Sequence, residues 1–390
     1  MLEFMDYVQA AFFSASRWNV DNSYATLNST VQSLLDFHTP RGVALHVSSL
    51  SSPNFATSYT VGSQGLVDGS LSFLYTSLGL NLESRSIQIP LRSLVLGYRH
   101  LRELKEPGHL NWNKLWQDGK LVTRKDALLY GRMYLPSSTL EALYLRRISP
   151  TRLLRINCVS GSTLPNGGTA LALLQNDYGK YSTEYLYSTD SALLGIRGLY
   201  NFGYDPRAPD AEPADHAWEH QNGRLSAGAE AYFSPRNKSA GVSAGLRFAT
   251  LPVHTGFPYT MTCTMNPLMG NLSATYAVKA GPNLALCSRF DFNWYSYESD
   301  VIVGMELSRR KVAPEDIAWA RNLLRPEWGD AAIKDDIESV IKARTDQNGK
   351  IGLLWEGKIN ELLVGVGANL DMKSKDRMLG NVGLQISYST

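Results

Sequence analysis

The chain has 390 residues, of which 44% are apolar and 19% charged, and its formal net charge is +2. This composition excludes a highly charged disordered chain and supplies enough apolar residues for a core. A near-neutral charge also argues against a nucleic-acid partner, because such domains usually carry a basic stripe. The longest apolar run is only Ala170–Leu174, well short of the roughly 20 residues of a membrane-spanning helix. A helical membrane protein is therefore excluded, but a membrane protein built from strands is not.

Neither disulfides nor a zinc site is indicated. The three cysteines, Cys158, Cys263 and Cys287, are widely spaced and contain no C-x-x-C pair. The first residues, Met1–Tyr7, are acidic and lack the basic region of a secretory signal as well as the arginine-rich character of a transit peptide. We therefore expect a chain made without a cleaved targeting segment.

The first predicted element is a short amphipathic helix over residues 24–37. Leu27, Val31, Leu34 and Leu35 share one helical face there, and the segment ends before Thr39-Pro40. We expect this helix to lie inside the rest of the fold.

Strands dominate the remainder of the chain, because one apolar set recurs at every second position and the intervening set is small or polar. The clearest case is 362–372, where Leu362, Val364 and Val366 alternate with small and polar residues. Turn-forming pairs such as Asn222-Gly223 and Asn348-Gly349 separate many of these segments. The predicted strands are 43–48, 55–61, 71–77, 127–135, 153–159, 169–175, 183–188, 192–202, 225–233, 242–248, 257–265, 272–279, 284–294, 301–308, 351–356, 362–372 and 382–388.

Two later stretches interrupt this pattern. Residues 203–223 are acidic and rich in proline, which predicts a loop. Residues 313–345 begin with Ala-Pro-Glu-Asp and carry apolar residues at helical spacing, which predicts an inserted pair of short helices.

One motif in the acidic loop fits a metal-dependent peptidase. His216-Ala-Trp-Glu-His220 matches H-x-x-E-H, a spacing that would place two imidazoles on one helix face with a carboxylate between them. Its surroundings are a proline-broken acidic loop without a third ligand, so a solvated loop is the preferred interpretation. We expect no enzyme, no bound metal and no cofactor.

The alternating pattern suits either a soluble sheet or a transmembrane β-barrel with an apolar outer face and a polar lumen. Two observations favour the barrel. Tyr, Phe and Trp lie near the predicted strand ends, as in interfacial girdles. The chain length also fits a barrel. About 290 residues remain after roughly 100 are set aside for the N-terminal segment and long loops, which is enough for about 19 strands. We therefore predict a single all-β barrel domain over 1–390.

Two aromatic pairs are candidates for partner-binding surfaces. Phe73 and Tyr75 share the outward face of one predicted strand, and Phe290 and Phe292 share that of another. Ordinary lipid-facing aromatics are the simpler explanation, but aromatic residues also dominate the energetics of protein interfaces.

The last strand carries the most specific signal. Asn381, Gly383, Ile386 and Tyr388 resemble the mitochondrial β-signal, a polar residue, a glycine and two hydrophobic residues at fixed spacing, by which an outer-membrane insertase recognises a final strand. Physically, such a segment is an edge strand whose free backbone groups can pair with a strand of the insertase. A bacterial porin would instead usually end on an aromatic residue.

Other motifs extend the likeness nearly end to end. They include Asp21-Asn-Ser-Tyr24, Tyr130-Gly-Arg-Met-Tyr-Leu-Pro-Ser-Ser138, Asn266-Pro-Leu-Met-Gly270 and Leu354-Trp-Glu-Gly357. With them the chain resembles the family of the fungal mitochondrial distribution and morphology protein 10.

This resemblance implies a nineteen-stranded barrel of the eukaryotic porin class in the mitochondrial outer membrane, with its first and last strands parallel. It implies membership of the sorting and assembly machinery, with that machinery's core barrel, its peripheral subunits and a translocase receptor subunit as partners. It also implies a place among the subunits of the endoplasmic reticulum–mitochondria encounter structure, with membrane lipids as further partners. Two alternatives stay open: a metabolite or ion channel of the porin type, and a soluble β-rich binding protein.

Overall fold

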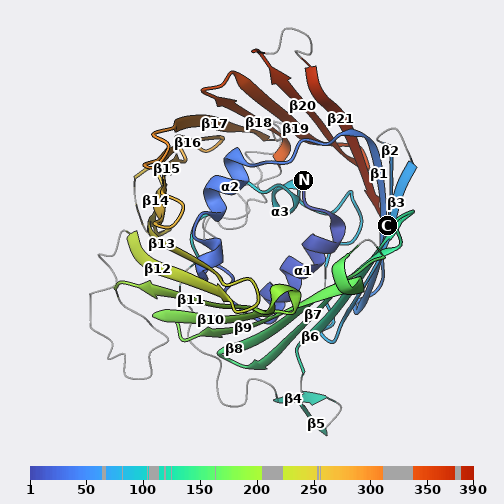
Figure 1. Cartoon of the computed structure of the whole chain (residues 1–390). Helices are drawn as coiled ribbons and strands as arrows, with labels where there is room; N and C mark the ends of the chain where they lie inside the picture. Colours follow the sequence, from blue (N-terminus) through green and yellow to red (C-terminus); the bar gives the residue numbers. More distant parts are fainter. Residues whose placement is uncertain are drawn as a thin grey trace, which may run out of the picture.

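The structure is a computed structural model that describes residues 1–63, 67–80, 82–102, 104, 114–117, 120–123, 125–162, 164–203, 223–252, 254, 256–310, 337–373 and 379–390. Nineteen strands form one sheet that closes on itself around a central lumen (Figure 1). Neighbouring strands are antiparallel except at the closure, where β1 and β21 run parallel. The predicted barrel of about nineteen strands, with parallel first and last strands, is confirmed.

The strands have the following bounds. Strands β1 to β3 are Gly42–Ser52, Phe55–Ser63 and Val67–Thr76, and β4 and β5, Lys114–Gln117 and Lys120–Thr123, form a separate hairpin. Strands β6 to β13 are Ala127–Leu135, Thr139–Ser149, Arg152–Ser160, Gly168–Asp177, Tyr181–Ser188, Leu193–Asn201, Gly223–Ser234 and Ser239–Thr250. Strands β14 to β21 are Tyr259–Asn266, Asn271–Val278, Leu284–Asn293, Ser299–Arg310, Ile337–Asp346, Lys350–Ile359, Leu362–Asp371 and Leu379–Ser389.

Short helices accompany the barrel. The α-helices are α1 (Phe4–Ala15), α2 (Ser29–Leu35) and α3 (Leu91–Leu94), and the 3-10 turns are η1 (Tyr24–Thr26), η2 (Pro165–Gly167) and η3 (Asp190–Ala192). The predicted helix over 24–37 is therefore present as η1 followed by α2. Helix α1 was not predicted, although Met5, Val8 and Phe12 share its buried face. Figure 1 shows all three α-helices inside the barrel.

The predicted helical insertion over 313–345 is wrong at its C-terminal end. Residues Ile337–Asp346 form strand β18, which pairs with both β17 and β19. Val340 faces the lumen and is buried, while its neighbour Ile341 is exposed on the outer face, so adjacent apolar residues mimic a helical spacing. Residues 311–336 lie outside the described part of the chain, as do 204–222 of the predicted acidic loop.

The two faces of the barrel wall have opposite character. Along β12, for example, Leu225 and Phe233 are exposed outside, whereas Ser226 and Glu230 face the lumen. The predicted apolar outer face and polar lumen are therefore both present. No helix within the described segments has the length and apolarity to cross a bilayer.

Candidate functional site: seam, outer wall and plugged lumen

The parallel seam between β1 and β21 contains Gly383, Ile386 and Tyr388 of the predicted insertion signal, and Asn381 precedes it on β21, paired with Asn369 of β20. Asn381 and Gly383 are on the lumen face of β21, and Ile386 and Tyr388 are on its outer face. Ile386 and Tyr388 lie opposite Leu45 and Val47 of β1, so their apolar side chains cover the seam from outside. We call the barrel end where β1 begins the N-rim and the end where β21 finishes the C-rim.

Gly383 is the point of closest approach at the seam. It pairs with Gly42 on β1 and with Gly367 on β20, so three glycines lie side by side. Pro40, the residue that brings the chain out of the lumen, crosses directly over them. A Cβ at position 383 would meet the Pro40 carbonyl and lie 2.7 Å from the Arg41 nitrogen, and one at 367 would lie 2.7 Å from Pro40 Cδ. Only glycine leaves room for this crossing.

Phe73 and Tyr75 are on the outer wall near the C-rim of β3. Their side chains are 46% and 48% exposed, and Phe73 stacks on Phe55 of β2 with ring centroids 6.3 Å apart. Phe55 also lies opposite Tyr75 in the β2–β3 register. The sequence pattern thus placed both residues correctly, and the structure adds Phe55 as a third member of the patch.

Phe290 and Phe292 are on the outer wall near the N-rim of β16. Phe290 is 44% exposed and Phe292 half-buried, and their rings stack with centroids 6.5 Å apart and planes 5° from parallel. Strands β3 and β16 are on opposite sides of the barrel (Figure 1). The two pairs therefore point away from each other and lie at opposite rims.

Helices α1 and α2 fill much of the lumen by packing on different parts of the wall. Met5, Val8 and Phe12 of α1 pack against a cluster that includes Leu74 and Leu128. Val31, Leu34 and Leu35 of α2 pack against small side chains on β15 and β16. The inner wall is apolar where helices dock and polar elsewhere.

Basic wall residues bind the C-terminal end of α2. Lys342 Nζ donates to the Ser33 carbonyl at 3.2 Å, and Arg344 Nη1 donates to the Leu35 carbonyl at 2.8 Å. Arg289 Nη1 forms an ion pair with Asp36, also at 2.8 Å. These cations satisfy carbonyls that the helix leaves unpaired and complement the negative end of its dipole.

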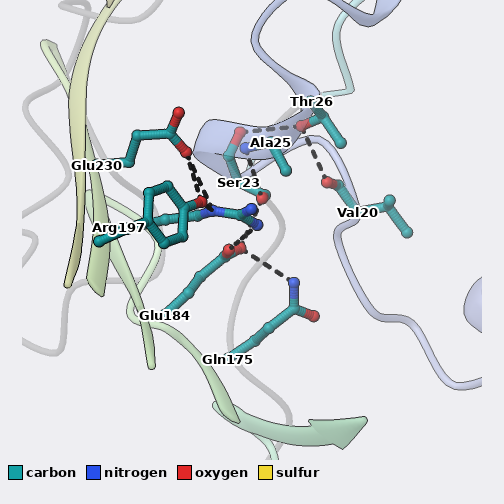
Figure 2. Close-up of polar contacts among 9 residues, drawn as sticks. Val20, Ser23, Ala25, Thr26, Gln175, Glu184, Arg197 and Glu230 are labelled. Atoms are coloured by element: carbon teal, nitrogen blue, oxygen red, sulfur yellow. Dashed lines mark hydrogen bonds and ion pairs between the residues drawn. The ribbon is translucent and has the colours of Figure 1, made fainter. Parts of the chain in front are cut away.

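A charged network holds the turn before η1 against β10 to β12 (Figure 2). Ser23 Oγ donates to Glu184 Oε1 at 2.5 Å, and Gln175 Nε2 donates to the same oxygen at 3.0 Å. Arg197 lies between Glu184 and Glu230, with ion-pair distances of 3.4 and 3.2 Å. One guanidinium thus forms ion pairs with both carboxylates, which limits the cost of burying them.

A second network fixes Asn22 and is almost completely buried. Asn22 Nδ2 donates to Asp177 Oδ1 at 2.6 Å, and Asn201 Nδ2 donates to Asn22 Oδ1 at 2.7 Å. Ser226 Oγ completes the chain by donating to Asn201 Oδ1 at 2.7 Å. The N-terminal segment is therefore bonded to β9, β11 and β12 as well as packed on the wall.

A further segment, residues 77–102, also enters the lumen, which the sequence analysis did not predict. Leu91 and Leu94 of α3 pack with Tyr7 of α1, and the Leu2 nitrogen donates to the Leu94 carbonyl at 2.7 Å. Ser86 exchanges hydrogen bonds with Ser389 at the end of β21, at 3.0 and 2.8 Å. These contacts join residues far apart in sequence, so no local pattern could have revealed them.

A cavity of about 780 Å³ remains between α1, the 92–102 segment and the wall formed by β16 to β18. Its lining includes Arg99, His100, Lys279 and Glu306. Burial lowers the pKa of His100, and the nearby Lys279 and Arg92 lower it further. The neutral form of this imidazole is therefore favoured inside the lumen.

No group of three or more metal-ligating side chains occurs among the described residues. The H-x-x-E-H motif at His216–His220 lies outside them, so its geometry is not tested.

Comparison with known proteins gives a consistent result. The family model described as "Mitochondrial distribution and morphology protein 10" matches residues 1–325 and 315–390. A protein of that name from Phaeosphaeria nodorum is 59% identical over 394 aligned residues, and one from Sclerotinia sclerotiorum is 53% identical over 402, each comparison covering 100% of both chains. A third, from Aspergillus terreus, is 44% identical, with 96% of this chain and 91% of the relative covered.

Proposed function

This chain belongs to the mitochondrial distribution and morphology protein 10 family, and from that membership and its apolar outer wall we propose that it is a non-enzymatic subunit of the mitochondrial outer membrane. The family is named for the distribution and form of mitochondria, so a role in these processes follows directly from membership. The finer proposal is that the barrel serves two assemblies. One is the sorting and assembly machinery, which matures β-barrel proteins and translocase receptors. The other is the endoplasmic reticulum–mitochondria encounter structure, where the barrel anchors a lipid-exchanging tether.

The observation that carries this proposal is the pair of separate aromatic patches on the outer wall. Phe55, Phe73 and Tyr75 form one patch at the C-rim, while Phe290 and Phe292 form the other at the N-rim. Stacked aromatic side chains on rigid strands are good interface anchors, because little conformational entropy is lost when they bind. Their positions on opposite sides of the barrel suit two different neighbours.

The proposal is tested with two double variants, Phe73→Ala/Tyr75→Ala and Phe290→Ala/Phe292→Ala, expressed in mitochondria that lack the native chain. We expect each variant to lose one assembly on native gels and to retain the other, because interface anchors typically contribute 2 kcal/mol or more each, about thirtyfold in affinity. Carbonate extraction measures membrane insertion of the same samples.

A matched control is Tyr200→Ala/Phe202→Ala. This pair has rings 5.0 Å apart and is likewise exposed, but it lies on and just beyond β11, away from both patches. It should leave both assemblies intact. If each patch variant also leaves both assemblies intact, the two-patch proposal is wrong.

The alternative function is a metabolite channel of the porin type. Helices α1 and α2 dock on different arcs of the wall, and residues 77–102 also lie in the lumen. Because these segments occupy the space through which a metabolite would pass, they favour the assembly function. A large and stable anion-selective conductance from the purified chain would instead favour the channel.

A further inference from the structure

Four basic side chains gather on the outer wall near the C-rim of β6 to β10: Lys125, Arg146, Arg152 and Lys180. All four are exposed. The orientation of the two arginines follows from their neighbours. Arg147 points inward to the Ser16 carbonyl and Leu153 is buried in the lumen, so Arg146 and Arg152 point outward. Within the described segments none of the four has an ion-pair partner.

Among the described residues, this basic group lies on one arc of the C-rim. On β17, Arg309 also points outward, but it is paired with Glu338 at 3.5 Å. Lys358, near the C-rim end of β19, is directed inward to the carbonyls of the lumen segment. From β19 to β3, the outward strand residues near this rim are uncharged, such as Ile359, Ser49 and Tyr75. Within the described part of the chain, the unpaired positive charge on the outer wall near this rim therefore lies over β6 to β10.

An apolar groove begins beside the two arginines and runs down the same wall. Its volume is about 570 Å³. The strand register places Arg146, Leu154, Leu174, Tyr185, Ile196 and Ala231 in one continuous row across six strands. Arg152 is two residues before Leu154 and shares its outward face. The side chains that line the groove are thus continuous with the guanidinium groups.

The floor and walls of this groove differ in size. Ala231 is a small residue at the end of this row, and Ala172 is a small residue in the next row, which also contains the large side chains of Tyr187 and Phe233. A shallow, almost wholly apolar channel between large side chains suits an extended hydrocarbon chain. Its basic end suits an anion, because a guanidinium can bind a phosphate through two parallel hydrogen bonds.

We propose that this surface holds an anionic glycerophospholipid, with its phosphate at Arg146 and Arg152 and its acyl chains along the groove. The inference rests on the proposed function in one respect, since it requires the chain to be in a membrane. Charge complementarity selects the anionic class over zwitterionic lipid, because each basic residue near an anionic membrane surface contributes about 1 kcal/mol, or roughly fivefold in affinity. The groove selects a lipid over a soluble anion.

The test is native mass spectrometry of the purified full chain in detergent, with phosphatidylglycerol or phosphatidylcholine added at equal concentration. We expect the wild-type chain to retain phosphatidylglycerol preferentially. The variant Arg146→Gln/Arg152→Gln should lose that preference by about twenty-five-fold, fivefold for each arginine. Arg309→Gln removes a basic residue on another arc and should leave the preference unchanged.

A second variant tests the groove without altering charge. Ala172→Trp fills the floor and should lower the retention of phosphatidylglycerol while Arg146 and Arg152 remain. If the arginine double variant and Ala172→Trp both retain phosphatidylglycerol as the wild type does, the lipid site is refuted. Loss of a protein subunit on native gels with unchanged lipid retention would also overturn it, and would assign the arginines to an acidic protein partner.

Carbonate extraction of mitochondria distinguishes a wrong lipid site from a wrong membrane location. A chain that resists extraction but shows no lipid preference contradicts only the lipid site. A chain that is extracted contradicts the membrane location, and with it both proposals.

Discussion

At the scale of single residues, Gly383 shows how one missing side chain permits closure of the barrel. The chain leaves the lumen at Pro40 and must begin β1 directly against β21. The Gly42–Gly383–Gly367 row leaves the backbone space to do so. The insertion signal predicted from the sequence therefore coincides with a steric requirement of the finished barrel.

We expect Gly383→Ala to impair closure even without an insertase. The added methyl group would collide with the Pro40 carbonyl and the Arg41 nitrogen, and overpacking of this kind typically costs about 1–3 kcal/mol. The measurement is refolding of the purified chain in detergent micelles, followed by its mobility on unheated gels. Gly365→Ala is the matched control, because a Cβ there would lie 3.8 Å from the Gln385 side chain, an ordinary contact. Equal refolding yields for the two variants would show that Gly383 serves recognition alone.

At the scale of elements, alternation predicted most strands because a barrel strand usually has one apolar and one polar face. It failed at β7 and β18. In β7, Leu143 and Leu145 face the lumen and are buried. They do so because α1 packs there, so both faces of the strand are apolar over 142–145 and the period of two disappears in that stretch. A strand that packs against a lumen helix therefore lacks the alternation of apolar and polar residues by which strands are predicted.

The same reasoning explains which site features could be foreseen. The outward direction of Phe73, Tyr75, Phe290 and Phe292 follows from period two alone. The bonds of Asn22 to Asp177 and Asn201 do not, since they join the N-terminal segment to strands more than 150 residues away. Helix α1 could have been predicted from the sequence, because the spacing of Met5, Val8 and Phe12 is helical.

The attachment of α2 to the wall gives a prediction at this scale. Lys342→Gln/Arg344→Gln removes the cations that bind the Ser33 and Leu35 carbonyls. A helix of seven residues is not stable alone, so its order depends on tertiary contacts. We expect faster amide exchange in residues 29–36 and little change in the strands, measured by hydrogen-exchange mass spectrometry. Arg309→Gln, on the outer face, should leave α2 protected, and unchanged protection in the double variant would show that apolar packing alone holds the helix.

At the scale of the whole molecule, the lumen contents are anchored to different arcs of the wall. Helix α1 packs near β2, β3, β6 and β7, while α2 packs near β15 to β17 (Figure 1). Residues 77–102 bridge α1 to the end of β21. Helix α1 is anchored on a different arc from α2, whereas Lys342 binds the carbonyls of both Ser33 in α2 and Leu96 in the 77–102 segment. The interior therefore behaves as a plug with several separate attachments rather than as a single gate.

This arrangement predicts the electrical behaviour of the purified chain in planar bilayers. The wild type should conduct far less than an open barrel of nineteen strands, because two helices and residues 77–102 occupy its lumen. Lys342→Gln/Arg344→Gln should add brief openings, because α2 and the Leu96 end of the 77–102 segment lose bonds to the wall, while α1 still limits the current. Phe73→Ala/Tyr75→Ala, on the outer wall, should leave the current at the wild-type level. A large steady wild-type conductance would mean that the lumen segments leave the wall in a bilayer, and the channel function would then be favoured over the plug.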